Sequence, residues 1–497
     1  MTLPAARSAI LGVDVGTSAL KAGLLSPEGE PLAAIVRIPY SLSSPAPGAM
    51  EQDPDDWWNA LIAACRQLVP GLGKHTRLLA VAIGGQAPTL CAVDAGLRPS
   101  TPAISWLDQR PAAEAERLYA RLGQPVPVWG SWPAQAAWLA HNRPAAFGRT
   151  RWLLGCPDYV VTQLTGQPVS LLAWPAADMQ AAEIDLTRVP PLREPGQVVG
   201  AVLPSAAEVT RLPAGTPVVA GFVDGIMGVL GSGVQQPGDA CINAGTSGTY
   251  SLLASPGQGY PVLDMVVVGA ATNTSGNALD WYMQRIAPAT SDYAPLLEQA
   301  AAVPAGASGL LFLPHLAGER APVRDARARG AWVGLSLDHD RRHLLRSVLE
   351  GVAFSLRSVQ ETLVEPGAPM GELRCVGGQA RSDVWNQIKA DVLDRPLLVP
   401  RVVEGAVVGA AMLGALGVGL YAGRAEAAAA MVHVARRFEP DPRRAALYAE
   451  LYALYATLYP SLREVSWRLH GLSAATDQPA PLNTCKSQAA ARSRPSF

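Results

Sequence analysis

Short apolar runs alternate with longer amphipathic segments along the first half of the chain. The apolar runs predict three strands, at residues 10–15, 22–25 and 78–84. Residues 53–69 space their apolar positions as a helix does, after an acidic start that includes a proline, and therefore predict a helix. Residues 110–165 are expected to be mostly helical, whereas the proline-rich residues 167–217 are expected to be irregular.

The alternation resumes after a turn at residues 237–239. It predicts a strand at residues 373–376 and helices at residues 339–363, 382–393 and 404–421. The longest apolar stretch, from Ala406 to Tyr421, is about 16 residues long, below the roughly 20 needed to span a bilayer, so we expect a buried helix there. From Gly471 onward the periodicity disappears and polar residues and proline accumulate, which is typical of a disordered tail.

Two successive blocks of strands followed by helices favour an α/β fold with two lobes. We therefore predict an N-terminal domain at residues 1–235, a C-terminal domain at residues 236–470 and a disordered tail at residues 471–497. Similarity between the blocks is confined to one turn and its flanking strands, which makes a duplication plausible without establishing it.

Composition fits a globular enzyme and argues against several classes of partner. The 497 residues allow two or three domains, and 49% of them are hydrophobic. A net charge of −1 argues against nucleic acid or an anionic membrane as a main partner. We recognise no export signal, and the six cysteines and seven histidines show no metal-binding spacing, so we expect a cytoplasmic protein with reduced cysteines.

Two similar turns stand out, DVGTS at residues 14–18 and AGTSG at residues 244–248. A glycine followed by hydroxyl residues at a hairpin tip lets N–H groups and Oγ atoms converge on an anion. Either turn alone is typical of an ordinary hairpin. Because there is one turn in each half, the pair suggests two lobes that hold the phosphates of one nucleotide between them.

Three charged residues lie near these turns. Asp224 follows a short strand, where it would either cap the next helix or act as a general base on a substrate hydroxyl. Asp14 would either stabilise its own turn or orient Mg²⁺. Lys21, one of only four lysines, would either meet a transferring phosphoryl group or be an ordinary surface residue.

Several further segments resemble the FGGY carbohydrate kinases, most closely their xylulokinase-like members. The pattern GAWVGL, seven residues and then HLLRSVLE, at residues 330–350, is similar to the C-terminal signature of that family. GERAP at residues 318–322, ARG at 328–330 and GGQARS at 377–382 also resemble it, as do both turns. Together these segments cover residues 10 to about 425 in the order of the family.

The resemblance implies a two-lobed, actin-like ATPase fold with RNase-H-like sheets and an ATP cleft between the lobes. It implies that Asp224 is the catalytic base, that Asp14 lies near Mg²⁺, and that Lys21 stands where glycerol kinase has an arginine. The nucleotide-binding residues that it implies are Gly16, Thr17, Ser18 and Lys21 at the first turn, Gly245, Thr246 and Ser247 at the second, and Gly377, Gly378, Gln379 and Ser382 on the adenosine side.

The predicted substrate loop departs from the family. After Gln86, where xylulokinases have Met-His and glycerol kinase Arg-Glu, this chain has Ala87 and Pro88, which offer no side-chain hydrogen bond. The departure is expected to alter selectivity. Trp106 and Asp108 keep a family-like loop that would still hold hydroxyl groups. Trp132 and Trp174 would either line the pocket or pack in the core.

The sequence thus predicts an ATP- and Mg²⁺-dependent kinase that phosphorylates a sugar or polyol hydroxyl. Because large α/β kinases often dimerise, a homodimer is expected. Two alternatives stay open. The same fold would also suit a kinase for a different ketose, polyol or non-sugar alcohol, or a catalytically silent protein that senses a sugar or a nucleotide.

Overall fold

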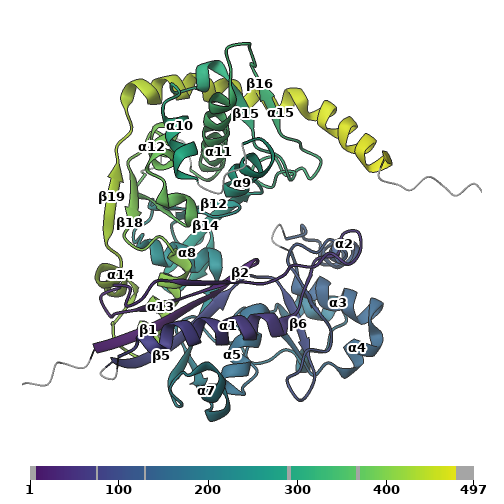
Figure 1. Ribbon diagram of the computed structural model, residues 1–497. Helices are drawn as coiled ribbons and strands as arrows, with labels where there is room; N and C mark the ends of the chain where they lie inside the picture. The colour runs from purple at the N-terminus through teal and green to yellow at the C-terminus, as the bar shows by residue number, and fades with distance from the viewer. Residues whose placement is uncertain (1–6, 74–75, 128–129, 288–292, 365–369, 477–497) are drawn as a thin grey trace, which may run out of the picture.

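The chain folds into two α/β lobes, one above the other in Figure 1, each built on one large sheet. The structure is a computed structural model that describes residues 7–73, 76–127, 130–287, 293–364 and 370–476. The lower lobe contains the N-terminal part of the chain and the upper lobe most of the C-terminal part.

The lower lobe is organised around a six-stranded sheet. Its strand order is β3 (Val36–Pro39), β2 (Ala19–Leu25), β1 (Arg7–Val15), β5 (Thr76–Gly85), β10 (Pro217–Val223) and β9 (Val198–Ala201). Strands β1, β5 and β10 are parallel, and the remaining pairings are antiparallel. Successive apolar residues of these strands point to opposite faces of the sheet and enter two different hydrophobic clusters, so the sheet is covered on both sides.

The upper lobe contains a seven-stranded sheet. Its strand order is β13 (Tyr260–Val262), β14 (Met265–Thr272), β12 (Gly248–Leu253), β11 (Ala240–Ala244), β17 (Leu373–Val376), β18 (Leu397–Pro400) and β19 (Val434–Phe438). Strands β11, β17 and β18 are parallel, and each neighbouring pairing outside them is antiparallel.

The two sheets share one topology over six strands. In each, an antiparallel hairpin is followed in space by two parallel strands and closed by an antiparallel edge strand. The sequence showed similarity only around the two turns, at the tips of the β1–β2 and β11–β12 hairpins. The repeated topology extends that similarity to the whole sheet.

Two helices join the lobes, α8 (Asp224–Ser232) and α13 (Gly405–Gly417). Each follows the last parallel strand of its own sheet, and the two pack against each other between the sheets (Figure 1). Helix α13 also packs on β1, β5 and β10, although it belongs in sequence to the second block. The seam between the lobes is therefore a shared core rather than a linker.

Glycine makes this seam possible. A Cβ on Gly409 of α13 would lie 2.0 Å from the Met227 carbonyl oxygen, and one on Gly231 of α8 would lie 2.0 Å from the Gly405 carbonyl oxygen. On β1, a Cβ on Gly12 would lie 2.2 Å from the Val407 carbonyl oxygen. The backbones of α8, α13 and β1 therefore approach more closely than any other residue permits.

Other elements cover the lobes. In the lower lobe these are α1 (Pro54–Leu68), α2 (Ala112–Leu122), α3 (Trp132–Asn142), α4 (Pro144–Arg149), α5 (Cys156–Thr165), α6 (Ala176–Ala181), α7 (Pro204–Thr210) and a small sheet of β4 (Glu51–Gln52), β7 (Ala103–Ile104), β6 (Leu90–Val93) and β8 (Trp152–Gly155). In the upper lobe they are α9 (Gly276–Arg285), α10 (Ala294–Ala301), α11 (Arg341–Leu363), α12 (Asp383–Leu393), α14 (Arg424–Met431), α15 (Pro442–Thr476) and the β15 (Leu311–Leu313) and β16 (Ala331–Val333) hairpin.

The structure differs from the sequence-based expectations in three places. The segment expected to be mostly helical contains strand β8, and the segment expected to be irregular contains β9 and α7. Helix α15 continues to Thr476, past the Gly471 at which we expected regular structure to end, and residues 477–497 lie outside the described residues. Tyr448, Tyr452 and Tyr455 of α15 pack into the upper-lobe core, which explains why this helix forms.

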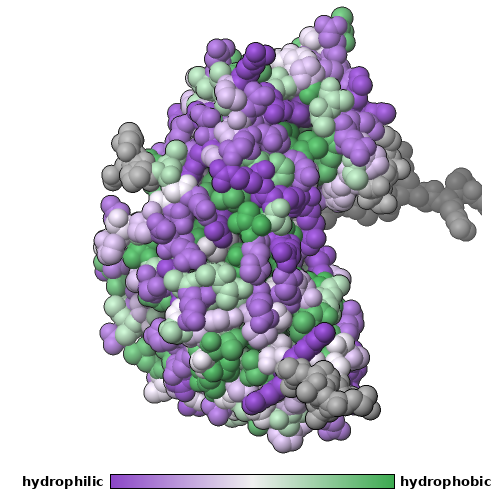
Figure 2. Space-filling view, turned by 90° about the vertical axis from the view of Figure 1, so that its left-hand side faces the viewer, coloured by the Kyte–Doolittle hydropathy of each residue, from purple (hydrophilic) through white to green (hydrophobic). Residues whose placement is uncertain are grey.

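Two surface properties bear on partners. Over the residues that the structure describes, no helix is long and apolar enough to cross a membrane. On the face that includes β19 and α14, hydrophobic residues are interspersed with hydrophilic ones (Figure 2), so this face singles out no dimer surface. The homodimer stays a prediction.

Candidate active site

The parallel strands β1, β5 and β10 end at one edge of the lower sheet. At the end of the central strand, a Cβ on Gly84 would lie 2.2 Å from the Phe222 carbonyl oxygen, and one on Gly85 would lie 2.4 Å from the Val15 carbonyl oxygen. This glycine pair lets β1 and β10 close in on either side of β5. Asp14 is the second-last residue of β1, and Asp224 directly follows β10. The two carboxylates therefore lie at the same end of the parallel strands.

Asp14 is a buried carboxylate with an unsatisfied atom. Its side chain is largely excluded from solvent, and its Oδ1 has no hydrogen-bond partner within the described part of the chain. Burial and the neighbouring charge of Asp224 raise the pKa of Asp14 to about 7, although Lys21 opposes this shift. An ionised carboxylate in this position is costly unless a cation approaches it.

Asp224 is the first residue of α8, and its carboxylate is half-buried. Val223 occupies the N-cap position, so the interpretation of Asp224 as the cap is wrong. Asp224 Oδ1 accepts a 2.7 Å hydrogen bond from the Gly225 N–H. Burial raises the pKa of Asp224, whereas the Gly225 N–H and the Lys21 ammonium lower it. These two donors favour the ionised form that a base needs.

Lys21 lies opposite Asp14 in the β1–β2 pairing and is not an ordinary surface lysine. Its Nζ is 3.0 Å from Glu404 Oε2, and Glu404 also contacts Arg381 at 2.8 Å. Burial opposes the charge of Lys21, but Glu404 and Asp14 outweigh it and raise its pKa. Glu404 precedes α13, so this ion pair connects the two lobes directly. We did not predict Glu404; the available signal was a single acid inside a long apolar stretch.

The first turn is held by side chains from several elements. Thr17 Oγ1 accepts a 3.0 Å hydrogen bond from Trp106 Nε1, and the Thr17 carbonyl accepts one of 2.8 Å from Gln52. The Tyr40 hydroxyl donates to the Gly16 carbonyl. Ser18 is exposed at the tip. The turn is therefore fixed from behind while its tip stays accessible.

Gln86, predicted to bind substrate, is buried behind this turn. Its Nε2 donates to Gln52 Oε1 at 2.7 Å and to the Gly16 carbonyl at 3.3 Å, and its Oε1 accepts from Thr89. Its amide thus joins the predicted substrate loop to the first turn. Ala87 and Pro88 are half-buried, and the Pro88 carbonyl accepts a 3.2 Å hydrogen bond from Gln135.

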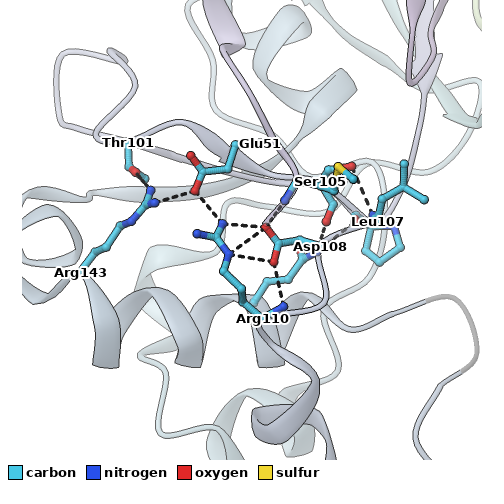
Figure 3. A network of polar contacts seen from close by, with 10 residues as sticks. Glu51, Thr101, Ser105, Leu107, Asp108, Arg110 and Arg143 are labelled. Atoms are coloured by element: carbon cyan, nitrogen blue, oxygen red, sulfur yellow. Dashed lines mark hydrogen bonds and ion pairs between the residues drawn. The ribbon is translucent and has the colours of Figure 1, made fainter. Parts of the chain in front are cut away.

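Asp108 belongs to a network of charges beside the loop (Figure 3). Its carboxylate accepts hydrogen bonds from the Arg110 side chain, at 2.6 Å for the closest, and from the Met50 N–H at 2.9 Å. Arg110 and Arg143 also both contact Glu51 Oε1. Within this network Asp108 positions the backbone of its own loop, on which Trp106 lies.

Trp132 and Trp174 pack in the core. Their rings are stacked, with centroids 4.8 Å apart, and both side chains are buried in the hydrophobic cluster around β6 and β8. This is the core-packing alternative for the two residues.

The second turn is joined to the predicted adenosine turn. Gln379 Nε2 donates to the Gly245 carbonyl at 3.0 Å and to Ser275 Oγ at 2.7 Å. Gly377 has a φ of 92°, and a Cβ there would lie 2.7 Å from the Ala244 carbonyl oxygen. Thr246 and Gly378 are exposed, Ser247 is half-buried, and Ser382 caps α12 by accepting from the Trp385 N–H at 3.2 Å.

Arg320 connects the upper lobe to the first turn. Its guanidinium lies 5.4 Å from the Trp106 ring centroid and donates to the Thr272 carbonyl at 3.1 Å. Arg320 belongs to the family-like segment at residues 318–322, and we did not predict a role for it. The structure thus places the sequence-predicted residues in two groups, one around the first turn in the lower lobe and one around the second turn in the upper lobe. Two contacts connect the lobes near these groups: the ion pair of Lys21 with Glu404, and the contact of Arg320 with the Trp106 ring.

We expect Asp14→Asn to stabilise the nucleotide-free protein at pH 8. The pKa of Asp14 is raised from 3.8 to about 7, so the folded protein binds this proton more tightly than the unfolded chain. The free energy of unfolding therefore falls as pH rises between these values. The substitution removes a penalty of roughly 1–3 kcal/mol at pH 8 and less at pH 5. Denaturant unfolding without divalent cations measures both values; equal or lower stability at pH 8 would contradict the assignment.

Comparison with known proteins identifies both halves of the chain. Residues 9–231 match the N-terminal domain model of the FGGY family of carbohydrate kinases, and residues 240–418 match its C-terminal domain model. The xylulose kinase of Bacillus subtilis is 28% identical over 93% of this chain and 98% of its own. The gluconokinase of Bacillus subtilis is 28% identical over 82% of this chain and 87% of its own.

The comparison with solved structures agrees on the fold. The crystal structure of a xylulose kinase from Rhodospirillum rubrum matches with a TM-score of 0.78 and 31% identity, over 92% of this chain and 99% of that one. The predicted two-lobed, actin-like fold is confirmed.

Proposed function

This chain belongs to the FGGY family of carbohydrate kinases, which makes it an ATP-dependent sugar kinase, and we propose that Asp224 is its catalytic base. The observation behind this proposal is the place of Asp224: it follows the end of a parallel strand, its carboxylate is half-buried, and Lys21 and the Gly225 N–H favour its ionised form. Ligands of open α/β sheets bind beyond the carboxyl ends of the strands.

In the proposed reaction, Asp224 accepts the proton of a sugar hydroxyl as its oxygen attacks the γ-phosphate of ATP. A bond forms between that oxygen and phosphorus, the bond to the β-phosphate oxygen breaks, and ADP leaves. Backbone N–H groups and hydroxyls of the turns at residues 16–18 and 245–247 would bind phosphate oxygens, and Lys21 would neutralise charge on the transferred group. Residues 377–379 and Ser382 would lie along the adenosine.

Mg²⁺ fits the same proposal. The unpartnered Oδ1 of Asp14, in a buried position where ionisation is otherwise costly, suits a divalent cation or its bound water. When bound, such an ion would neutralise charge on the phosphate oxygens. Asp14 would orient the ion. The nearby ammonium of Lys21 favours the ionised forms of both Asp14 and Asp224.

For the substrate, we propose a ketose or a related open-chain sugar derivative. Relatives at the same level of identity include both a xylulose kinase and a gluconokinase, so the family match does not choose between a ketose and a sugar acid. In the substrate loop, Gln86 is already bonded to Gln52 and Gly16, and Ala87 and Pro88 bring no polar side chain. Selection among sugars would therefore depend on other residues near Trp106.

A coupled assay of ADP release over a panel of pentuloses, hexuloses, polyols and aldonates tests the function. The proposal expects sugar-dependent ADP release with at least one compound, accompanied by a sugar phosphate. ATP binding with no turnover on any compound would favour the catalytically silent alternative. Turnover only on the polyols would leave the base assignment in place and overturn the proposed substrate class.

A further inference from the structure

A cavity of about 420 Å³ lies in the upper lobe, away from both predicted phosphate turns. It opens between the loop that joins β15 to β16 and the middle turns of α15, the yellow helix of Figure 1. The loop contributes Arg324, Asp325 and Arg327, and the helix contributes Tyr459, Arg463 and Trp467. Three guanidinium groups and one carboxylate therefore line one cavity.

The single carboxylate is already saturated. Asp325 Oδ2 accepts hydrogen bonds from the Tyr459 hydroxyl and the Trp467 indole N–H, and Oδ1 accepts one of 2.8 Å from the Arg327 N–H. Although burial opposes it, these bonds hold the pKa of Asp325 down at about 2. Asp325 also pairs with Arg327, whose Nε lies 3.6 Å from Oδ1, so it organises the wall of the cavity and leaves Arg324 and Arg463 without a carboxylate.

Only one of the three arginines is paired with the carboxylate. Arg327 stacks on Trp467, 3.7 Å from the ring centroid, and Arg463 lies 5.3 Å from the same ring. Neither Arg324 nor Arg463 has a carboxylate partner within the ranges that the structure describes. Arg324 also has a φ of 52°, a strained conformation for a residue with a Cβ. All three arginines are exposed, so water screens their mutual repulsion, and together they still form a positively charged wall that attracts anions.

We propose that this cavity binds a small sugar phosphate. Its volume is within the range of small-ligand pockets, and guanidinium groups bind phosphate oxygens with paired, charge-assisted hydrogen bonds. The remaining polar lining would meet a sugar hydroxyl: the Tyr459 hydroxyl lies on the same wall as the arginines, and its oxygen can still accept a hydrogen bond. The site is separate from the ATP and sugar positions proposed above.

The same loop reaches the other lobe. Glu319 and Asp325 pair through two backbone hydrogen bonds, of 2.9 and 2.8 Å, so the segment between them is a tight loop. Arg320 lies within it and contacts Trp106 of the lower lobe, which in turn bonds Thr17 of the first turn. Occupancy of the cavity would therefore favour the loop conformation that holds the lobes together, and would lower the KM of the sugar substrate.

Isothermal titration with ribose 5-phosphate, ribose and inorganic phosphate tests the proposed site. The wild type and the double variant Arg324→Gln/Arg463→Gln are compared with Arg468→Gln, which removes an exposed arginine from the same helix. The expected result is that ribose 5-phosphate binds best, that the double variant binds it at least about tenfold more weakly, and that Arg468→Gln does not. ATP binding should be equal in all three proteins.

Equal affinity of the double variant for ribose 5-phosphate would overturn the site, and equally tight binding of inorganic phosphate would overturn its sugar-phosphate class. For the coupling, ribose 5-phosphate should lower the sugar KM about fivefold in the wild type and not in the double variant; an unchanged wild-type KM would overturn it. The ribose 5-phosphate titrations contain no ATP and therefore allow no turnover, so failure of the proposed catalytic base would not affect the binding result.

Discussion

Replacing Asp224 with asparagine is expected to lower kcat by a factor of about 10²–10⁴ while ATP binding stays nearly unchanged. An amide cannot accept the proton of the sugar hydroxyl, but it keeps the shape of the carboxylate and can still accept from the Gly225 N–H. Because burial raises the pKa of Asp224, its charge is a cost to the fold at pH 8, so the variant should be at least as stable as the wild type.

The stability result distinguishes a chemical role from a structural one. Steady-state kinetics would be measured beside nucleotide titration and denaturant unfolding, with Asp56→Asn as the control. Asp56 is also an acid in the first turn of a helix, α1, but lies away from the seam between the lobes. Wild-type kcat in Asp224→Asn would exclude the base assignment. An equal loss of kcat in Asp56→Asn would instead show that the effect comes from removing a negative charge at the start of a helix.

Replacing Gly409 with alanine is expected to destabilise the protein by about 3 kcal/mol or more, through overpacking. The added Cβ would lie 2.0 Å from the Met227 carbonyl oxygen, a backbone atom that cannot rotate away. Helices α8 and α13 would have to separate, which would also move Asp224 at the start of α8 and Glu404 just before α13. We therefore expect reduced activity together with reduced stability.

The matched control is Gly148→Ala in α4, where an added Cβ would meet no atom within 4 Å. Alanine favours helix, so this variant should be as stable as the wild type or up to about 1 kcal/mol more stable. Denaturant unfolding of both variants measures the contrast. If Gly409→Ala had the same denaturant midpoint as the wild type, the close approach of α8 and α13 would not be required for the stability of the interface between the lobes.

Local patterns were sufficient for four strands of the two large sheets, in whole or in part: β1, β2, β5 and β17. The strand at residues 373–376 was predicted with its observed bounds, because a short apolar run between turn residues has few alternatives. Strand β8 was missed because its four residues lie between helices and pair only with β6, a contact made across about 60 residues of sequence that local periodicity does not record. Helix α15 was expected to end by Gly471 and continues to Thr476; the tyrosines that pack it into the core, Tyr448, Tyr452 and Tyr455, lie well before this extension and do not explain it.

For the candidate site, the sequence indicated which residues have side chains suited to phosphoryl transfer. It did not indicate which of these side chains contact one another in the fold. Asp14, Lys21 and Asp224 were found from their positions beside turns and strand ends. Glu404 and Arg320 were missed as site residues because their roles depend on contacts between the lobes, with Lys21 in one case and Trp106 in the other. The inward direction of the Gln86 amide likewise depends on Gln52, which lies 34 residues away in the sequence.

The most direct test of the central claim is a crystal structure with a non-hydrolysable ATP analogue, Mg²⁺ and a sugar that the assay identifies. We expect the phosphates to lie between residues 16–18 and 245–247, Mg²⁺ to lie beside Asp14, and one sugar hydroxyl to be within hydrogen-bond distance of Asp224. Phosphates bound outside these two turns, or a reacting hydroxyl that faces another base, would contradict it.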